Sequence, residues 1–315
     1  MEKVMNYPKV SVILLNWNSY EDTIECLESL KKITYPNYNV VIVDNASSGD
    51  DVKVLRKKYG AYIHIIANDQ NFGFPGGCNI GMRYALSEGA ENLLLLNNDT
   101  VVDPDFLTEL VKVAESEPLI GIVGSKIYYY SHPESIESAG GRIRWWLGHI
   151  EVYGKVKDVG QWDEVAERDF VYGTSFLIKK KLIDRISFMD TYFFFGVEEY
   201  DYCTKAKRAG FKVVYVPQSK VWHKKGASSS KLPQFPEIQD KVKNKQGWRQ
   251  YKYFYQFFRR YCPPVLFIVP FVLHVTLVGS FLFFLSHADF KTIRKGGARR
   301  LISLFCWTGK PRFPY

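Results

Sequence analysis

Strand-like and helix-like patterns alternate four times in the N-terminal part of the chain. Each of four apolar runs has the length of one strand, and each is followed by a helical pattern, such as Ile24, Leu27 and Leu30 at helical spacing after the first run. Repeated strand–helix units predict an α/β fold with a doubly wound, mostly parallel sheet, right-handed crossovers and flanking helices. The predicted strands are Val10–Leu15, Val40–Val43, Tyr62–Ala67 and Leu93–Leu96.

Asparagine or aspartate follows several of the predicted strands at their carboxyl ends. In an open α/β sheet these ends lie along one edge, which is where ligands bind. Both residues are also ordinary turn formers, so one of them alone carries little weight. Their repetition along one edge instead predicts a ligand site formed by Asn16, Asp44, Asn71, Asn97 and Asp99.

Two segments next to this edge carry local signals. After the fourth strand, Asp103 is predicted as the N-cap of a helix and Pro104 as its first residue. After the third strand, the glycine-rich stretch Asn71–Gly81 leads to a helix predicted to begin near Asn79. It lacks the spacing of a dinucleotide-binding loop, and it is interpreted either as a flexible connection that needs positive φ or as backbone that contacts a ligand.

The second half of the chain is less regular. Residues 128–168 are interpreted as loops and short strands over the site. Farther on, Glu198, Glu199 and Asp201 open a predicted helix that ends at Gly210. Acidic residues at that end complement the helix dipole, and a carboxylate behind an aromatic run would also gain basicity through desolvation. Both interpretations remain open at this point.

A single histidine, His223, follows a predicted strand over Phe211–Val216 that Pro217 is expected to end. A lone histidine is more often structural than a metal ligand. Only a meeting with Asp99 in the folded chain would favour a metal site here, because carboxylate and imidazole groups are common metal ligands.

Positive charge is concentrated at the C-terminal end. From Lys220 onward, 18 Lys and Arg face three acidic residues, so this tail carries +15 while the rest carries −6, for the total of +9. Such a tail predicts an anionic partner such as a phospholipid surface. Five scattered cysteines without a Cys-x-x-Cys pair, and an N-terminus without a signal-peptide pattern, are typical of a chain that stays in the reducing cytosol.

Together these motifs resemble inverting glycosyltransferases of family 2 with the GT-A fold, and most of all the rhamnosyltransferase-like branch. The resemblance covers about Lys9 to Ser230 and implies a nucleotide-sugar transferase domain over 1–230, followed by a basic, aromatic-rich membrane-association region over 231–315. It implies that Asp44 accepts a hydrogen bond from a uracil or thymine ring. The donor-binding residues that it implies are Asn16, Asn18, Asp44, Asn45, Asn71, Gly73, Asn79, Asn97 and Asn98.

The resemblance also implies a divalent cation, Mg²⁺ or Mn²⁺. Asn97-Asn98-Asp99 stands where the family has its Asp-x-Asp metal motif. Asn97 offers an oxygen but no charge, so cation binding rests mainly on Asp99 and the donor diphosphate and is expected to be weak. Trp222-His223 resembles the late Trp-His of the family, whose histidine can reach the metal or the diphosphate.

Glu199 stands where the family has its catalytic base, and Glu198 is the rival for that role. The implied reaction is a single displacement in which the base deprotonates an acceptor hydroxyl. The donor is expected to be a UDP-sugar or dTDP-sugar, with dTDP-rhamnose as one candidate, so that hexosyl or rhamnosyl groups are transferred. The acceptor is expected to be a lipid-linked glycan or a polysaccharide at the cell surface.

Residues 265–285 form a 21-residue apolar run with basic residues on both sides. The run is long enough to span a bilayer, but the paired basic flanks favour a re-entrant or in-plane segment at the cytoplasmic membrane face over a single span. The alternative is a helical appendage folded on the catalytic domain.

Two other functions remain open at the sequence level. A sugar nucleotidyltransferase shares the architecture, but it would be expected to carry a Gly-rich basic loop where this chain has Asn16-Trp17-Asn18. A non-catalytic membrane scaffold is the second alternative, because Asn97 replaces an expected acid. Nucleic-acid binding is disfavoured, since the chain has no known reader motif.

Overall fold

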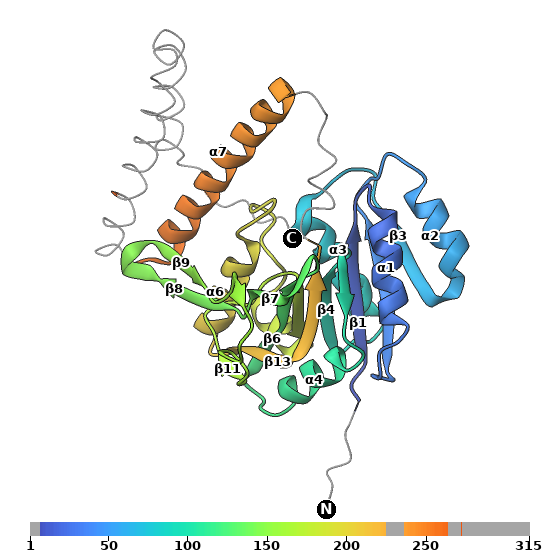
Figure 1. Ribbon diagram of the computed structural model, residues 1–315, viewed down its shortest axis with the longest axis horizontal. Helices are drawn as coiled ribbons and strands as arrows, with labels where there is room; N and C mark the ends of the chain where they lie inside the picture. Colours follow the sequence, from blue (N-terminus) through green and yellow to red (C-terminus); the bar gives the residue numbers. More distant parts are fainter. Residues whose placement is uncertain (1–6, 225–235, 264–271, 273–315) are drawn as a thin grey trace, which may run out of the picture. The chain divides into compact units, whose positions relative to one another are not determined.

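The computed structural model describes residues 7–224, 236–263 and 272 of the 315-residue chain (Figure 1). The chain forms two compact units, Met1–Ile143 with Ile150–Val242, and Arg144–His149 with Lys243–Tyr315. The first unit contains the sheet and all the residues that the sequence predicts for the site.

Four parallel strands form one part of the sheet, in the order β4-β1-β2-β3. Asn16 at the end of β1 lies opposite Asp44 on β2, and Leu15 lies opposite Asn97 on β4. The predicted doubly wound, mostly parallel α/β sheet is confirmed. The elements of this part are β1 Val10–Asn16, α1 Tyr20–Leu30, β2 Tyr38–Asp44, α2 Asp51–Tyr59, a 3₁₀ turn Gly60–Tyr62, β3 Ile63–Ala67, α3 Gly73–Ser87 and β4 Asn92–Asn97.

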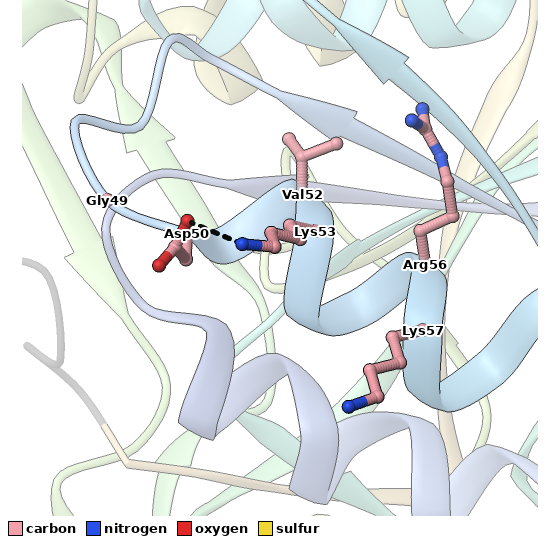
Figure 2. Close-up of a pocket in the computed structure, with 6 residues that line it drawn as sticks. All are labelled: Gly49, Asp50, Val52, Lys53, Arg56 and Lys57. Atoms are coloured by element: carbon pink, nitrogen blue, oxygen red, sulfur yellow. Dashed lines mark ion pairs between the residues drawn. The ribbon is translucent and has the colours of Figure 1, made fainter.

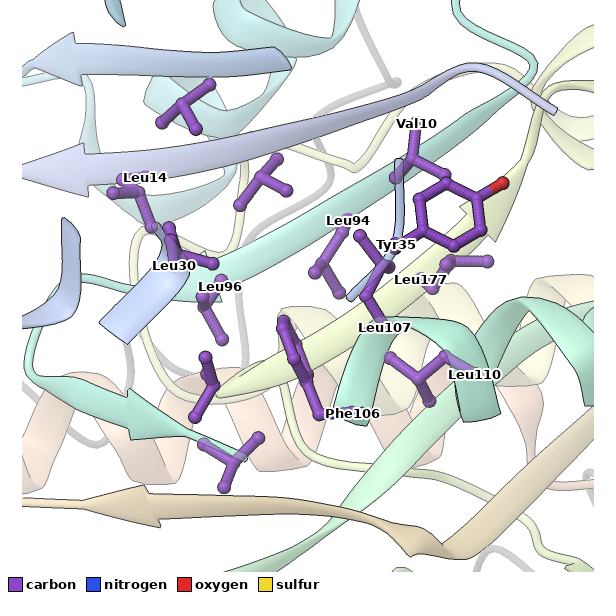
Figure 3. Close-up of a cluster of buried hydrophobic side chains, with 14 of the residues drawn as sticks. Val10, Leu14, Leu30, Tyr35, Leu94, Leu96, Phe106, Leu107, Leu110 and Leu177 are labelled. Atoms are coloured by element: carbon purple, nitrogen blue, oxygen red, sulfur yellow. The ribbon is translucent and has the colours of Figure 1, made fainter. Parts of the chain in front are cut away.

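The side chains of β1 alternate between the two helical layers. Val10, Val12 and Leu14 belong to a buried cluster with residues of α1 and of α4 (Phe106–Ala114) (Figure 3). Ile13 points to the opposite layer, because a Cβ atom added to Gly81 of α3 would lie 2.6 Å from Ile13 Cγ2. Burial on both faces explains why the strand is apolar along most of its length, since each fully buried Val or Leu side chain contributes about 1.5–3 kcal/mol.

Helix α3 begins at Gly73, six residues before the predicted start at Asn79. Gly73 has a φ of +74°, which L side chains rarely adopt, and the helix then continues through Gly77. A Cβ atom at Gly77 would lie 2.3 Å from Leu15 Cδ1. The helix therefore packs closely on the sheet at Gly77. Because the chain is helical from Gly73 onward, the interpretation of the whole stretch as a flexible connection is wrong.

The helix after β4 also differs from its prediction. A short strand, β5 (Thr100–Val102), comes first, and α4 then begins at Phe106 with Asp105 rather than Asp103 at the cap position. The Asp103 carboxylate instead accepts a hydrogen bond of 3.0 Å from the Asp105 N–H, which stabilises the turn that contains Pro104.

The second part of the sheet mixes strand directions. Strand β12 runs antiparallel to both β4 and β6, and β13 runs parallel to β6. The remaining elements of the first unit and its boundary are β6 Ile120–Tyr129, β7 His132–Ser138, β8 Gly141–Arg144, β9 His149–Val152, β10 Val156–Lys157, β11 Ala166–Glu167, β12 Ser175–Lys179, α5 Lys180–Ile186, α6 Glu198–Arg208 and β13 Lys212–His223. The predicted short strands over 128–168 are therefore present.

Strand β13 continues through Pro217, where the sequence predicted its end. A register shift between Val216 and Lys220 accommodates the proline, which cannot donate a ladder hydrogen bond. Beyond the shift, β13 pairs with β5 and places His223 opposite Thr100. The extra length of this strand carries His223 to the carboxyl end of β4.

The second unit contains most of α7 (Pro236–Tyr261) and the 3₁₀ turn Trp145–Leu147. The Trp145 ring centroid lies 5.6 Å from that of Phe257 and 5.9 Å from that of Phe258. Among the described residues, none of the helices combines the length and the apolar character needed to cross a bilayer. The apolar run 265–285 lies outside the described residues apart from Val272.

Candidate active site

The side chains at the ends of β1 and β2 form a buried polar cluster. The Asn16 amide donates to Asp44 Oδ2 over 2.7 Å and to Asp51 Oδ1 over 3.0 Å. Ser47 donates its N–H to Asp44 Oδ1 and its hydroxyl to Asp44 Oδ2. A carboxylate has about four lone-pair positions, so Asp44 retains one for a ligand after these three bonds. This is compatible with the predicted hydrogen bond from a pyrimidine ring.

Asn18 ties the turn after β1 to the turn after β2. It adopts a φ of +54°, and its backbone N–H donates to Ser47 Oγ over 2.8 Å. Its Oδ1 atom accepts a bond of 2.8 Å from the Ser48 N–H. The two turns predicted to hold the nucleotide are therefore bonded to each other.

Asn45 connects the end of β2 to the start of α3. Its amide donates to Asn71 Oδ1 over 2.9 Å and to the Gly73 carbonyl over 3.1 Å. Next to Gly73, the Phe74 N–H donates to the carbonyl of Phe194 over 2.9 Å, in the loop that precedes α6. These bonds link the predicted donor side of the site to the segment that carries Glu199.

Asn79 and Asn98, both predicted to bind the donor, have their amides engaged within the protein. Asn79 exchanges two hydrogen bonds with the backbone of Met189, of 2.8 and 3.0 Å. Asn98 donates to the hydroxyls of Ser19 and Thr23, over 2.8 Å each. These contacts account for buried asparagines at the two positions, and their donor contacts stay predictions.

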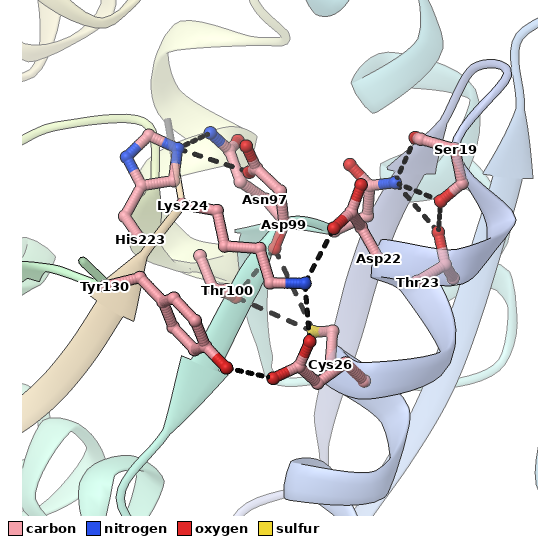
Figure 4. Close-up of polar contacts among 12 residues, drawn as sticks. Ser19, Asp22, Thr23, Cys26, Asn97, Asp99, Thr100, Tyr130, His223 and Lys224 are labelled. Atoms are coloured by element: carbon pink, nitrogen blue, oxygen red, sulfur yellow. Dashed lines mark hydrogen bonds and ion pairs between the residues drawn. The ribbon is translucent and has the colours of Figure 1, made fainter. Parts of the chain in front are cut away.

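Asn97, Asp99 and His223 meet at the carboxyl end of β4 (Figure 4). His223 Nε2 lies 3.2 Å from Asp99 Oδ1 and 3.4 Å from the Asn97 amide nitrogen. This is the meeting on which the metal interpretation of His223 depended. It follows from the pairing of β13 with β5, which begins directly after Asp99.

The other ring nitrogen of His223 faces Glu137, a residue that the sequence analysis missed. Nδ1 lies 2.8 Å from Glu137 Oε2, and Glu137 is buried on β7. Burial alone would lower the pKa of His223, but hydrogen bonds to Asp99 and Glu137 and their negative charges outweigh it and raise the pKa to about 9. No motif surrounds Glu137 in the sequence, so only the pairing of the strands could place it.

Lys224 fixes the end of β13 to α1 (Figure 4). Its Nζ atom forms ion pairs with Asp22 at 2.7 Å and with Glu25 at 2.5 Å, and its backbone N–H donates to the Asp99 carbonyl over 3.0 Å. Tyr130 donates its hydroxyl to Glu25 over 2.6 Å. Partly exposed ion pairs contribute little stability, but this set fixes the backbone beside the Asp99–His223 pair.

Asp99 and His223 offer a divalent cation two converging ligand atoms. Carboxylate oxygen and imidazole nitrogen are both suitable ligands of Mn²⁺, and an Nδ1 bond to a carboxylate is the usual support for an imidazole that binds metal through Nε2. In the part of the chain that the structure describes, no group of three or more His, Cys, Asp or Glu could hold a metal ion. The residues therefore fit a cation that takes its other ligands from a diphosphate, as Mg²⁺ commonly does.

Glu198 and Glu199 open α6 with different surroundings. Glu198 is buried, and its Oε2 accepts hydrogen bonds from the backbone N–H groups of Gly196 and Val197. Burial raises the pKa of both carboxyl groups, but these backbone bonds oppose the rise at Glu198, whereas the charge of Glu198 adds to it at Glu199. Glu199 also remains partly exposed. It is therefore the better placed of the two to accept a proton.

The segment from Tyr172 to Thr174 precedes β12 and contacts the end of β4. Burial raises the pKa of the Tyr172 hydroxyl to about 12, and the negative charges of Glu199 and Glu137 add to this effect. Two residues later, the carbonyl of Thr174 accepts a hydrogen bond of 3.0 Å from the Asn97 N–H. The segment that contains Tyr172 and Thr174 is thus bonded to the end of β4.

A pocket of about 460 Å³ lies elsewhere, against the start of α2 (Figure 2). Asp50 and Lys53 line it and form an exposed ion pair of 4.0 Å. None of the residues predicted for the site lines this pocket. The candidate active site is therefore defined by its polar side chains at the sheet edge rather than by this cavity.

Comparison with known proteins gives relatives that fit this site. The low-salt glycan biosynthesis hexosyltransferase Agl10 of Haloferax volcanii is 26% identical over 208 residues, which cover 65% of this chain and 63% of that protein. The amylovoran biosynthesis glycosyltransferase AmsB of Erwinia amylovora is 24% identical over 217 residues, which cover 66% of this chain and 67% of that protein. This chain thus spans less than two thirds of the length of the Haloferax protein.

The fold is similar to that of the mannosyltransferase PcManGT from Pyrobaculum calidifontis, solved in complex with GDP-Man and Mn²⁺. The TM-score is 0.57 at 16% identity, over 96% of this chain and 84% of that one. At this identity the likeness shows the GT-A fold alone. The family model described as Glycosyl transferase family 2 matches residues 11–194. This match covers more than half of the chain, from the first strand of the sheet to the loop before α6, and the chain therefore belongs to glycosyl transferase family 2.

Proposed function

We propose that this chain is an inverting glycosyltransferase that moves a sugar from a UDP-sugar or dTDP-sugar to a hydroxyl of a cell-surface glycan, with dTDP-rhamnose as one candidate donor. The observation that carries the proposal is the meeting of Asp99 and His223 at the carboxyl end of β4. Glu199, in the first turn of α6, is the proposed base. Membership of the family supports it, as do relatives named for glycan biosynthesis.

In the proposed reaction Glu199 accepts the proton of an acceptor hydroxyl. The hydroxyl oxygen attacks the anomeric carbon from the face opposite the nucleoside diphosphate, and the diphosphate leaves with the electrons of the broken bond. Asp99 and His223 would hold a Mg²⁺ or Mn²⁺ ion, which supplies positive charge to the departing diphosphate when bound. The cluster of Asn16 and Asp44 holds the turns that bind the nucleotide.

The test is a donor screen with the purified full-length chain, using UDP-sugars, dTDP-sugars and GDP-sugars with and without Mn²⁺. We expect metal-dependent release of one nucleoside diphosphate, faster with acceptor present, and a product of inverted anomeric configuration. A sugar nucleotidyltransferase would instead release pyrophosphate from a nucleoside triphosphate, and a non-catalytic scaffold would release neither product. Either result would overturn the proposal.

The pH dependence of transfer should report the surroundings of Glu199. A base with a raised pKa is protonated earlier as the pH falls, so kcat/KM should decline at a pH well above the ordinary glutamate value of 4.5. Removing the neighbouring charge with Glu198→Gln should move this acid limb to lower pH. The measurement is kcat/KM against pH for both proteins, and coincident profiles would contradict the assignment of the limb to Glu199.

The acceptor that we propose is lipid-linked, with the enzyme at the cytoplasmic membrane face. The basic composition of 231–315 and its apolar run support this, because anionic lipid attracts juxtamembrane cations at about 1 kcal/mol each. Trp146 at the turn of the second unit is 56% exposed, and exposed tryptophan is favoured at membrane interfaces.

Removing the tail should separate catalysis from membrane binding. The full chain is expected to sediment with membranes and to resist a salt wash. A chain that ends near Lys245 should stay in solution, bind donor and transfer poorly to a lipid-linked acceptor, while retaining transfer to a water-soluble acceptor. Full-length protein in the soluble fraction without detergent, equally active on both acceptors, would contradict both the location and the acceptor class.

A further inference from the structure

Strand β7 contains a bulge beside the candidate active site. Strands β6 and β7 run antiparallel, with Ile127 opposite Ser138, but the next pair joins Tyr128 to Ile136. Glu137 is therefore the extra residue between the two pairs. A bulge changes the direction in which a side chain points, and bulges are frequent next to active sites. Here the carboxylate of Glu137, the bulged residue, contacts the His223 ring.

The bulge is covered and fixed by the chain that passes over it. A Cβ atom on Gly154 would lie 2.3 Å from the Glu137 carbonyl oxygen, so only glycine permits this close approach. On either side, the Lys155 N–H donates to the Ile136 carbonyl over 2.7 Å, and the Ala139 N–H donates to the Tyr153 carbonyl over 2.6 Å. Glu137 is only 3% exposed. A carboxylate buried this deeply is costly unless it is paired, and one of its partners, at 2.8 Å, is the His223 ring.

We propose that Glu137 is a positioning residue that orients the His223 ring so that Nε2 points at the cation it shares with Asp99. Glu137 Oε2 lies 2.8 Å from Nδ1, while Nε2 on the other side of the ring lies 3.2 Å from Asp99 Oδ1. A carboxylate on the far nitrogen fixes the ring and strengthens it as a metal ligand. Loss of such a partner typically weakens metal binding by about 10- to 100-fold. The proposal rests on the proposed metal-dependent transfer.

The test measures metal binding without requiring sugar transfer. Mn²⁺ is titrated into the full-length chain in the presence of UDP, and separately of dTDP, while free Mn²⁺ is followed by electron paramagnetic resonance. Glu137→Gln keeps the shape and an acceptor oxygen but loses the charge, and it should weaken Mn²⁺ binding by at least about 10-fold. The Mn²⁺ concentration for half-maximal transfer should rise in parallel, while kcat at saturating Mn²⁺ stays close to that of the wild type.

Two further variants control for folding and for charge. Glu134→Gln removes an exposed carboxylate from the same strand and should bind Mn²⁺ as the wild type does. Glu137→Asp retains the charge with a shorter reach and should bind Mn²⁺ with intermediate strength. Thermal unfolding of each variant is measured alongside, and Glu137→Asp carries the test if Glu137→Gln does not fold.

A double variant tests whether Glu137 acts through His223. His223→Ala sets the lowest affinity, and Glu137→Gln should then cause no further loss, because the partner through which it acts is gone. Additive losses, full Mn²⁺ binding by Glu137→Gln, or a wild-type chain that binds no Mn²⁺ with either nucleotide would overturn the proposal. Failure of the proposed function alone gives another result, in which Mn²⁺ and nucleotide bind normally but no sugar is transferred.

Discussion

Changing Asp99 to asparagine is expected to remove most sugar transfer while the protein remains folded. Asp99 is the one carboxylate of the Asn97-Asn98-Asp99 motif, and it lies 3.2 Å from His223 Nε2. A bound cation contributes several kcal/mol of charge stabilisation to the transition state. Losing about 3 kcal/mol of it corresponds to a decrease in kcat/KM of roughly two powers of ten. The measurement is kcat/KM over a range of Mn²⁺ concentrations, with circular dichroism to verify the fold.

Asp103→Asn is the matched control for this substitution. Asp103 lies in the following turn, where its carboxylate accepts a hydrogen bond from the Asp105 N–H, and asparagine can accept the same bond. This variant should keep both its rate and its metal dependence. If Asp99→Asn behaved in the same way as Asp103→Asn, the assignment of the metal site to Asp99 would be wrong.

Glu199→Gln should retain donor binding and lose transfer by roughly two to four powers of ten, which is the usual contribution of a positioned base. The amide keeps the shape of the side chain but cannot accept the acceptor's proton. Binding of the nucleotide sugar is measured by calorimetry without acceptor, and transfer is measured in single-turnover experiments, so that binding and chemistry are separated.

Glu198→Gln distinguishes the two neighbouring glutamates. The Glu198 carboxylate already accepts the N–H groups of Gly196 and Val197, and glutamine retains an oxygen for these bonds. We therefore expect this variant to keep most of its transfer activity. A loss of transfer in Glu198→Gln, with activity preserved in Glu199→Gln, would assign the base to Glu198.

The parallel part of the fold could be predicted because its information is local. Each strand there is followed by its own helix, and the polar residue at each strand end stands next to the apolar run that precedes it. Asn16 and Asp44 were placed at one edge on this basis, and the structure pairs them across β1 and β2. The antiparallel part could not be predicted in this way, because β12 pairs with β4 and β6, which are distant in sequence.

Individual residues of the candidate site could be predicted from the sequence, but their contacts with one another could not. Asp99 and His223 were identified separately, but their meeting depends on β13 continuing past Pro217, a position at which a proline normally argues against a strand. Glu137 was missed because a bulge, rather than any sequence pattern, brings its side chain to the site. Asn79 shows a second limit of the sequence, because it was predicted to bind the donor and its amide is bonded to the backbone of Met189.

His223 lies at the end of β13, late in the sequence, and this position affects when the newly synthesised chain can complete the site. Asn97 and His223 are 126 residues apart in sequence, and contacts of such separation form late in folding. Asn16, Asp44 and the turns that follow them are synthesised long before His223. The Asp99–His223 pair can therefore form only after every other residue predicted for the site has been synthesised.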